Sequence, residues 1–143
     1  MKKILIMGLP GSGKTTLAQA LQNKLVELGR TSDWYNADQI REQHNDWDFS
    51  EAGRLRQASR MKQLADTSES DFVICDFVAP TQQLRDEFAA DYVIWMDTIT
   101  ESRFADTNQL FESPSQFNIQ VSVQNSEFWA DYIAEQLISA DGS

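Results

Sequence analysis

The chain has 143 residues, of which 41% are hydrophobic and 24% are charged, a balance typical of one globular domain. With 12 Lys and Arg residues against 22 Asp and Glu residues, the formal net charge is −10, and a field of that sign repels nucleic acids and anionic membranes. A single cysteine, Cys75, excludes an internal disulfide, and a single histidine, His44, excludes a multi-histidine metal centre. No apolar run approaches the roughly 20 residues of a membrane span, and no signal peptide is readable, so we expect a cytoplasmic protein.

Apolar runs alternate with helical periodicities along the chain. We predict strands at 3–7, 34–37, 72–78 and 92–96, and an edge strand at 118–123. Helices are predicted at 14–28 and 50–65, with a short helix from Pro80 and another from the capping-box pair Thr98 and Glu101. Ser126 is expected to cap a last helix, and the tail after Ser139 is expected to be loose. This alternation predicts one α/β domain over residues 1–143, with a parallel sheet covered by helices on both faces in three layers. Ligands of such sheets bind beyond the carboxyl ends of the strands.

A glycine-rich segment joins the first predicted strand to the first predicted helix. It reads Gly8-Leu-Pro-Gly-Ser-Gly-Lys-Thr15, which fits the Walker A pattern. Small residues let backbone N–H groups surround a phosphate, the helix dipole favours the anion, Lys14 adds a charge, and Thr15 can ligate Mg²⁺. An empty glycine-rich turn is the alternative, but the flanking strand and helix favour a site for ATP or GTP. The candidate nucleotide-binding residues are Gly8, Pro10, Gly11, Ser12, Gly13, Lys14, Thr15 and Thr16.

Two aspartates follow predicted strands near this loop. Asp38 comes after the strand at 34–37, where a carboxylate can accept the proton of an acceptor hydroxyl or hold Mg²⁺ through water; the alternative is a helix N-cap, and the two are compatible. Asp76 ends an apolar run and can hold Mg²⁺ opposite Thr15, or can be a strand-end carboxylate bonded to backbone donors. The predicted metal ligands are therefore Thr15, Asp38 and Asp76, whereas Asp97 is interpreted as structural.

Arginines and one aromatic residue cluster in the segment 41–60. Arginine binds phosphate or sulfate oxygens through two N–H groups at once, so Arg41 and Arg54 are predicted ligands, whereas Arg56 and Arg60 fit a solvated helix face. Phe49 could stack on a base or pack against the following helix. Downstream, the polar segment 103–117 is either a lid over the phosphates, with Arg103 offsetting transition-state charge, or a plain connecting loop.

Four stretches together resemble the adenylylsulfate (APS) kinase family. They are the loop at 8–15, Asn36-Ala-Asp-Gln-Ile-Arg41, Phe49-Ser-Glu-Ala-Gly-Arg54 and Phe77-Val-Ala-Pro80. The resemblance implies a nucleotide-kinase fold with a five-stranded parallel sheet, usually dimeric, that transfers the γ-phosphoryl of MgATP to the 3′-hydroxyl of adenylylsulfate. It also implies that Asp38 lies by the acceptor hydroxyl, that Arg41 and Arg54 grip the phosphosulfate side, and that Phe49 stacks on adenine.

The chain departs from the family pattern at three places. Ala79 replaces a serine near the acceptor, Gln57 replaces an asparagine, and the lid is shortened to residues 103–117, without the family's lid lysine. We still count Gln57 and Ala79 among the substrate-binding residues, and Lys14, Asp38 and Arg103 as catalytic.

Other functions remain open at this point. One alternative is a polynucleotide 5′-hydroxyl kinase or a nucleoside or nucleotide kinase, although the negative charge argues against nucleic-acid substrates. Another is a degenerate nucleotide-binding module without turnover, which Ala79 and the short lid favour and the intact Lys14 and Asp38 oppose. The expected partner is a small-molecule acceptor, adenylylsulfate or a related nucleotide.

Overall fold

The computed structural model describes residues 1–141 and is built on a parallel sheet. The strands are β1 (Lys2–Gly8), β2 (Ser32–Asn36), β3 (Phe72–Asp76), β4 (Tyr92–Met96) and β5 (Ile119–Val121). They lie in the order β2-β3-β1-β4-β5, and each neighbouring pair is parallel. The predicted parallel sheet is confirmed, and β5 lies at its edge as the sequence indicated.

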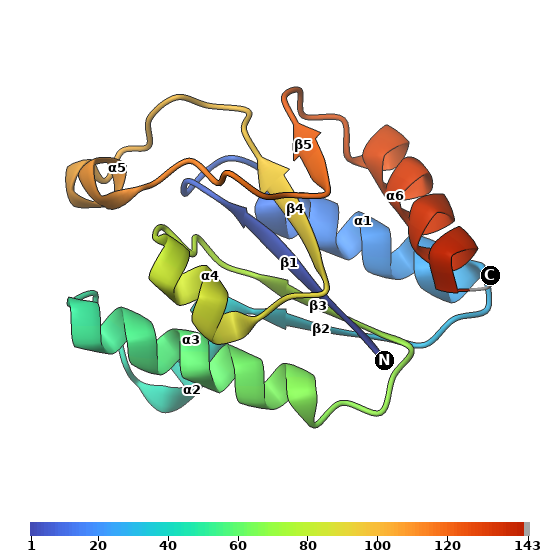
Figure 1. The fold of residues 1–143 in the computed structure, drawn as a ribbon, viewed down its shortest axis with the longest axis horizontal. Helices are drawn as coiled ribbons and strands as arrows, with labels where there is room; N and C mark the ends of the chain where they lie inside the picture. The colour runs from blue at the N-terminus through green and yellow to red at the C-terminus, as the bar shows by residue number, and fades with distance from the viewer. Residues whose placement is uncertain (142–143) are drawn as a thin grey trace.

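Helices cover both faces of the sheet (Figure 1). Side chains alternate along β1, so that Ile4 and Ile6 join one core with helices α1 (Lys14–Glu27) and α6 (Ser126–Asp141). Leu5 and Met7 face the other core, beneath α2 (Ala37–His44), α3 (Glu51–Asp66) and α4 (Gln82–Phe88). The short helix α5 (Ala105–Leu110) lies past the carboxyl ends of the strands, apart from both layers (Figure 1). The three-layer α/β prediction is confirmed.

The predicted helix from Thr98 and Glu101 is wrong. The chain there has no helix until Ala105, and the Thr98 hydroxyl donates instead to the Ser12 carbonyl at 2.7 Å. Thr98 therefore supports the phosphate loop rather than beginning a helix.

Several boundaries also differ from the predictions. Helix α4 begins at Gln82 rather than Pro80, because Thr81 provides the N-cap oxygen. Asn125, rather than Ser126, accepts the capping hydrogen bond of α6 from the Phe128 N–H. Helix α6 continues through Asp141, so it includes part of the tail predicted to be loose, and the last two residues of that tail lie outside the described chain. Strand β3 ends at Asp76, and the chain turns at Ala79, whose φ is 46°.

Among residues 1–141, no helix is long and apolar enough to span a bilayer. Cys75 is buried in the core, as predicted, and His44 is exposed at the end of α2. Burial raises the pKa of the Cys75 thiol well above its usual range, so this cysteine stays neutral and packs as an apolar side chain.

Candidate active site

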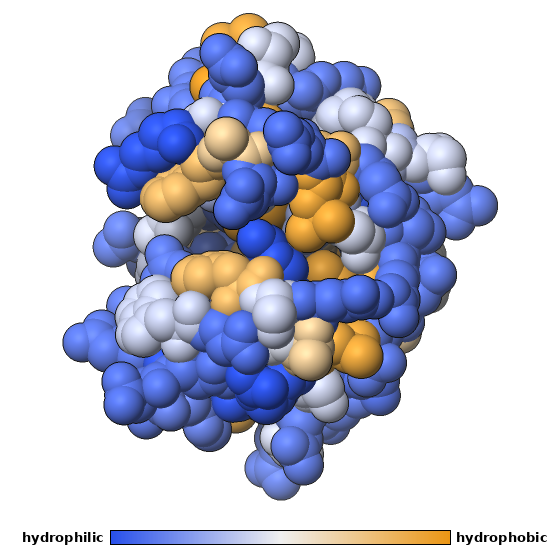
Figure 2. All heavy atoms as spheres, turned by 90° about the vertical axis from the view of Figure 1, so that its left-hand side faces the viewer, coloured by the Kyte–Doolittle hydropathy of each residue, from blue (hydrophilic) through white to orange (hydrophobic). Residues whose placement is uncertain are grey.

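The carboxyl ends of the strands open into a cavity of about 1080 Å³. Figure 2 shows this side of the molecule, where hydrophobic residues border a hollow lined by hydrophilic ones. Most of the wall comes from five segments: the phosphate loop, the start of α2, the 47–57 segment, the turn after β3, and residues 103–107; Leu84 and Gln124 also line it. Ligand pockets typically measure about 300–1,000 Å³, so this cavity has room for more than one small ligand.

The predicted phosphate loop forms one wall of the cavity. Of its eight candidate residues, six line the wall: Pro10, Gly11, Gly13, Lys14, Thr15 and Thr16. Gly11 and Gly13 have φ values of 84° and 100°, which favour glycine. The loop curls tightly enough for Lys14 Nζ to donate to the Leu9 carbonyl at 3.0 Å. The N-terminus of α1 therefore faces the cavity, the arrangement that binds phosphate.

Gly8 and Ser12 lie behind the cavity wall rather than on it. A Cβ at Gly8 would approach the Met96 carbonyl to 2.6 Å, so this glycine allows β1 and β4 to pack closely. The Ser12 N–H donates to the Leu9 carbonyl at 3.2 Å, and the buried Oγ of Ser12 has no hydrogen-bond partner among residues 1–141. The Ser12 carbonyl accepts from Thr98 and Gln124, which brace the loop from behind.

Burial shifts the pKa of two groups beside the loop. Lys14 is almost fully buried, and this desolvation lowers its pKa to about 8 despite the attraction of Asp76 and Asp38. Desolvation likewise raises the pKa of Asp76 to about 6, although hydrogen bonds from Trp34 and Asn36 and the charge of Lys14 oppose the shift. Both groups are thus poorly solvated, and the buried ammonium group would be stabilised by an anionic ligand.

Asp76 is held by side chains, not by the backbone donors that the sequence left as an alternative. Trp34 Nε1 donates to its Oδ2 at 2.7 Å, and Asn36 Nδ2 donates to its Oδ1 at 2.9 Å. The Thr15 hydroxyl lies 3.5 Å from the same Oδ1. Since an ionised carboxylate has about four lone-pair sites, one remains open.

Thr15 and Asp76 have the chemistry of a magnesium site. Thr15 Oγ1 donates toward Asp76 and accepts from Asn36 Nδ2 at 3.1 Å, which leaves one lone pair for a cation. Among residues 1–141, no three His, Cys, Asp or Glu side chains could hold a metal together. Thr15 and Asp76 together offer two oxygen donors, which fits Mg²⁺, since this cation binds through one or two protein ligands together with water and substrate phosphates.

Asp38 lines the cavity from the first turn of α2. The interpretation of Asp38 as a helix N-cap is wrong, because Asn36 caps α2 by accepting from the Gln39 N–H at 3.1 Å. The exposed Asp38 carboxylate is consequently not required for helix capping and faces the same cavity as Lys14.

Arg41, Phe49 and Arg54 meet at the far wall. The guanidinium of Arg41 lies 4.4 Å from the centre of the Phe49 ring, and that of Arg54 lies 5.5 Å from it. Arg54 also donates to the Phe49 carbonyl at 2.9 Å. Burial lowers the pKa of both arginines, yet both stay charged because the ordinary pKa of arginine lies far above neutral pH. With 52% of Phe49 exposed, this wall offers two cations and an aromatic ring to a ligand.

Gln57 and Ala79 line the cavity but differ in what they offer. The Gln57 amide is engaged: Nε2 donates to the Ala37 carbonyl at 2.9 Å, and Oε1 accepts from Arg60 at 3.1 Å. It thereby joins α3 to the start of α2. Ala79 offers only a methyl group to the cavity. Its backbone is in the left-handed region, and its carbonyl accepts from Arg85 Nε at 2.8 Å.

The segment 103–117 reaches the cavity through Arg103 and α5. Thr107 of α5 accepts a hydrogen bond from Arg54 Nη2 at 3.4 Å, which connects this segment to the arginine wall. Of the predicted lid, residues 103–107 line the cavity, whereas residues 108–117 do not; that the segment acts as a lid stays a prediction.

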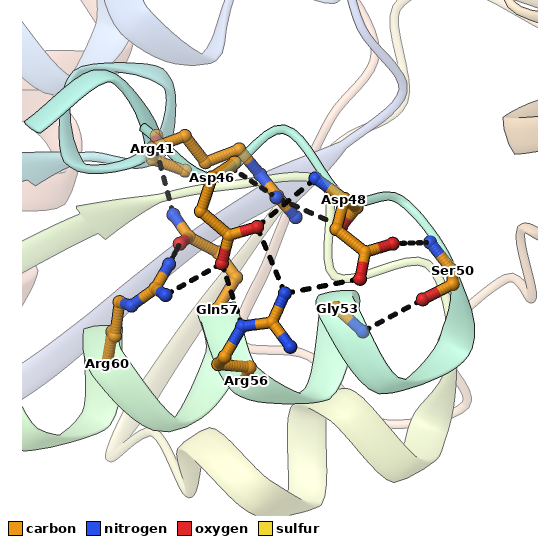
Figure 3. Close-up of polar contacts among 9 residues, drawn as sticks. Arg41, Asp46, Asp48, Ser50, Gly53, Arg56, Gln57 and Arg60 are labelled. Atoms are coloured by element: carbon orange, nitrogen blue, oxygen red, sulfur yellow. Dashed lines mark hydrogen bonds and ion pairs between the residues drawn. The ribbon is translucent and has the colours of Figure 1, made fainter. Parts of the chain in front are cut away.

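Arg56 and Arg60 do not line the cavity. They project from α3 toward Asp46 and Asp48, with which they form ion pairs (Figure 3). The sequence predicted that Arg56 and Arg60, unlike Arg41 and Arg54, are not ligands, and their placement outside the cavity agrees with this. They form an ion-pair network, however, rather than a plain solvated face.

The sequence patterns did not indicate several residues that line the cavity or hold its side chains. Asn36 and Trp34 hold Asp76, and Trp47, Thr107 and Gln124 line the walls. Only Asn36 had a local signal, since an asparagine before a helical segment is a favoured N-cap. The others come from segments whose approach to the cavity depends on the fold.

Comparisons with known proteins agree with this geometry. The sequence profile described as adenylylsulphate kinase matches residues 2–121. A bifunctional enzyme CysN/CysC of Rhodopirellula baltica is 34% identical over 85 residues, which is 57% of this chain and 13% of that protein. The chain thus spans only a small part of that relative's length.

Solved structures with the same fold include two kinds of kinase. Mycobacterium tuberculosis APS kinase CysC, in complex with AMPPNP and APS, has a TM-score of 0.79 at 17% identity, covering 96% of this chain and 97% of that one. Shikimate kinase from Acinetobacter baumannii, in complex with shikimate, has a TM-score of 0.67 at 17% identity, covering 98% and 94%. These two likenesses show the fold, and the profile over residues 2–121 shows that the chain belongs to the adenylylsulphate kinase family.

Proposed function

We propose that the protein transfers the γ-phosphoryl group of MgATP to the 3′-hydroxyl of adenylylsulfate or a closely related nucleotide. The observation that carries the proposal is one continuous cavity with the phosphate loop on one wall and Arg41, Phe49 and Arg54 on another. Asp38 lines the same cavity, so a donor, an acceptor and a base can meet there.

The phosphate loop holds the donor in this proposal. Backbone N–H groups at the start of α1 and the buried Lys14 ammonium group bind the β- and γ-phosphates. Bound Mg²⁺, held by Thr15 and Asp76, would neutralise charge on these phosphates. Hydrogen bonds from Asn36 and Trp34 orient the Asp76 carboxylate without any contribution from the nucleotide.

The opposite wall holds the acceptor. Phe49 stacks on the base, and Arg41 and Arg54 bind the anionic phosphosulfate group. The acceptor oxygen attacks the γ-phosphorus, the bond from that phosphorus to the β–γ bridging oxygen breaks, and ADP leaves. The hydroxyl proton passes to the Asp38 carboxylate, while Arg103 offsets charge on the transferring group.

The lid, the homodimer and the cytoplasmic location stay predictions. In the lid proposal, the Arg54–Thr107 contact lets acceptor binding order the 103–117 segment, which then excludes water.

A direct assay tests the proposed function. The protein is incubated with MgATP and, separately, with adenylylsulfate, nucleosides, nucleotides and 5′-hydroxyl oligonucleotides, while ADP release is followed. ADP formed with adenylylsulfate alone supports the proposal. ADP formed only with oligonucleotides would move the assignment to a polynucleotide kinase, and ATP binding without any turnover would indicate a nucleotide-binding module.

A matched pair of lysine variants checks the donor wall. Lys14→Ala should lower the turnover rate by about 10²–10³-fold, the usual loss when a preorganised electrostatic contact is removed. Lys24→Ala, on the same helix but paired with Asp131 on the surface, should leave turnover unchanged. Retained activity in Lys14→Ala would contradict the assignment of the loop.

A further inference from the structure

A carboxylate outside the cavity is bound by two arginines. Asp46 lies in the connection between α2 and α3, and its carboxylate accepts from Arg56 Nε at 2.8 Å, Arg56 Nη2 at 3.0 Å and Arg60 Nη2 at 2.7 Å (Figure 3). These hydrogen bonds hold the pKa of Asp46 far below its usual range. The connection is thereby anchored to α3 through a charged group.

The backbone of the same connection holds Arg41. Arg41 Nη1 donates to the Asp46 carbonyl at 3.0 Å and to the Asp48 carbonyl at 3.1 Å. Asp48 is fixed in turn, because its N–H donates to Asp46 Oδ1 at 3.2 Å and its carboxylate pairs with Arg56 at 3.2 Å. The Asp46 carboxylate therefore positions both carbonyl groups that hold the guanidinium.

The hydrogen bonds of this cluster leave Arg41 without a direct ion pair among residues 1–141. The carboxylates of Asp46 and Asp48 bond to Arg56 and Arg60, so Arg41 hydrogen-bonds only to the two carbonyl oxygens, although the nearby charge of Asp46 still favours its charged form. In the described part of the chain Arg41 has no ion-pair partner, although only 5% of it is exposed. Its Nη1 hydrogens serve the two carbonyls, which leaves Nε and Nη2 for a ligand. A buried, unpaired guanidinium favours an anion strongly.

We propose that Asp46 is a positioning residue for the acceptor site: through Arg56 and Arg60 it fixes the backbone that orients Arg41 toward the anionic group of the acceptor. The inference rests on the proposed function for the identity of that acceptor. It assigns to Arg56 and Arg60 a role in acceptor affinity, although neither of these two arginines lines the cavity.

Asp46→Asn tests the proposal, with Asp66→Asn as its matched control. Asp66 also accepts from two cations, Lys3 at 2.8 Å and Lys62 at 3.1 Å, but at the other end of α3. We expect Asp46→Asn to raise the KM for adenylylsulfate at least tenfold, while kcat and the KM for ATP change less than threefold. Asp66→Asn should leave all three within threefold. An unchanged KM for adenylylsulfate in Asp46→Asn overturns the proposal.

A double-mutant cycle separates positioning from general support of the fold. If Asp46 acts through Arg41, then Asp46→Asn should weaken adenylylsulfate binding by less than twofold in an Arg41→Ala background. The same loss in both backgrounds overturns the proposal. Melting temperatures accompany each variant, and if Asp46→Asn does not fold, Arg60→Gln replaces it in the same cycle with the same expectations.

A ligand-free readout keeps this proposal separate from the proposed function. If the wild-type protein neither binds nor phosphorylates adenylylsulfate, the proposed function fails, and the positioning role is then decided by a crystal structure of ligand-free Asp46→Asn. Loss of the two Arg41–carbonyl contacts supports the role of Asp46. Both contacts retained at wild-type distances overturn it.

Discussion

The side-chain amide of Asn36 donates to the carboxylate of Asp76 across 2.9 Å, joining residues 40 positions apart on neighbouring strands. The orientation of this amide is determined by its own oxygen, which accepts from the Gln39 N–H as the N-cap of α2. The nitrogen therefore faces Asp76 and Thr15, and both of its hydrogens are used. One residue thus connects helix α2, which carries Asp38, to the candidate magnesium ligands.

Asn36→Ser should weaken the effect of magnesium on ATP binding. Serine keeps the N-cap acceptor but removes the amide nitrogen that donates to Thr15 and Asp76, and a hydrogen bond to a charged group is worth about 1.5–3 kcal/mol. We expect the gain in ATP affinity on adding Mg²⁺, measured by titration calorimetry, to fall about tenfold. Asn23→Ser, at an exposed position of α1, serves as the control. An equal loss of affinity with and without Mg²⁺ would show that Asn36 only supports the loop.

Asp38→Asn should impair turnover more than ATP binding. The exposed carboxylate does not cap α2, so its loss leaves the helix intact while removing the proposed proton acceptor, a contribution of about 10²–10⁴-fold. Steady-state kinetics and ATP titration measure the two effects separately. Glu42→Gln, an exposed neighbour on α2, should change neither. Parallel losses of turnover and ATP affinity would point to a structural role for Asp38.

Gly53→Ala should destabilise the protein and weaken acceptor binding together. An alanine Cβ would lie 2.2 Å from the Asp48 carbonyl oxygen, one of the two that hold Arg41. Alanine normally stabilises a helix by about 0.5–1 kcal/mol over glycine, but overpacking against backbone costs about 1–3 kcal/mol and should prevail.

Urea denaturation and the KM for adenylylsulfate measure the two consequences of Gly53→Ala. Ser59→Ala, on an exposed position of the same helix, should be neutral or slightly stabilising. A more stable Gly53→Ala protein with normal acceptor affinity would mean that the connection can move without disturbing Arg41.

Asp71→Asn should lower stability at neutral pH and have less effect in acid. Asp71 accepts from the Thr31 N–H at 3.2 Å and from Arg30 at 3.1 Å, and these bonds lower its pKa in the folded state. A carboxylate with a lowered folded pKa stabilises the protein above its unfolded pKa of about 3.9, and this stabilisation is lost as the pH falls through the folded pKa.

Melting temperatures at several pH values from 7 to 3 measure this effect of Asp71. The difference between wild type and Asp71→Asn should be constant down to about pH 4 and should shrink below it. Glu69→Gln, at a nearby exposed position, should follow the wild type throughout. A difference that persists unchanged at pH 3 would rule out ionisation of Asp71 as its source.

Local patterns predicted most of the secondary structure because they depend on neighbouring residues. The apolar runs became buried parallel strands, and the phosphate loop formed where its glycines, Lys14 and Thr15 stand together in the sequence. The capping-box pattern at Thr98 failed because its hydroxyl is used by the Ser12 carbonyl, a group 86 positions away. A capping pattern carries no information about such a distant competitor.

The sequence by itself determined the phosphate-binding segment, the alternation of strands and helices, and the clustering of Arg41, Phe49 and Arg54, since each is encoded within a short stretch. Tertiary structure alone decided that Trp34 and Asn36 hold Asp76 and that Gly8 and Ser12 lie behind the wall. It also decided that Arg56 and Arg60 bind Asp46 and Asp48, while Arg41 has no ion-pair partner within residues 1–141. The physical reason is that hydrogen bonds and ion pairs form between whichever groups the packed sheet and helices bring within reach, and that proximity is not encoded in local spacing.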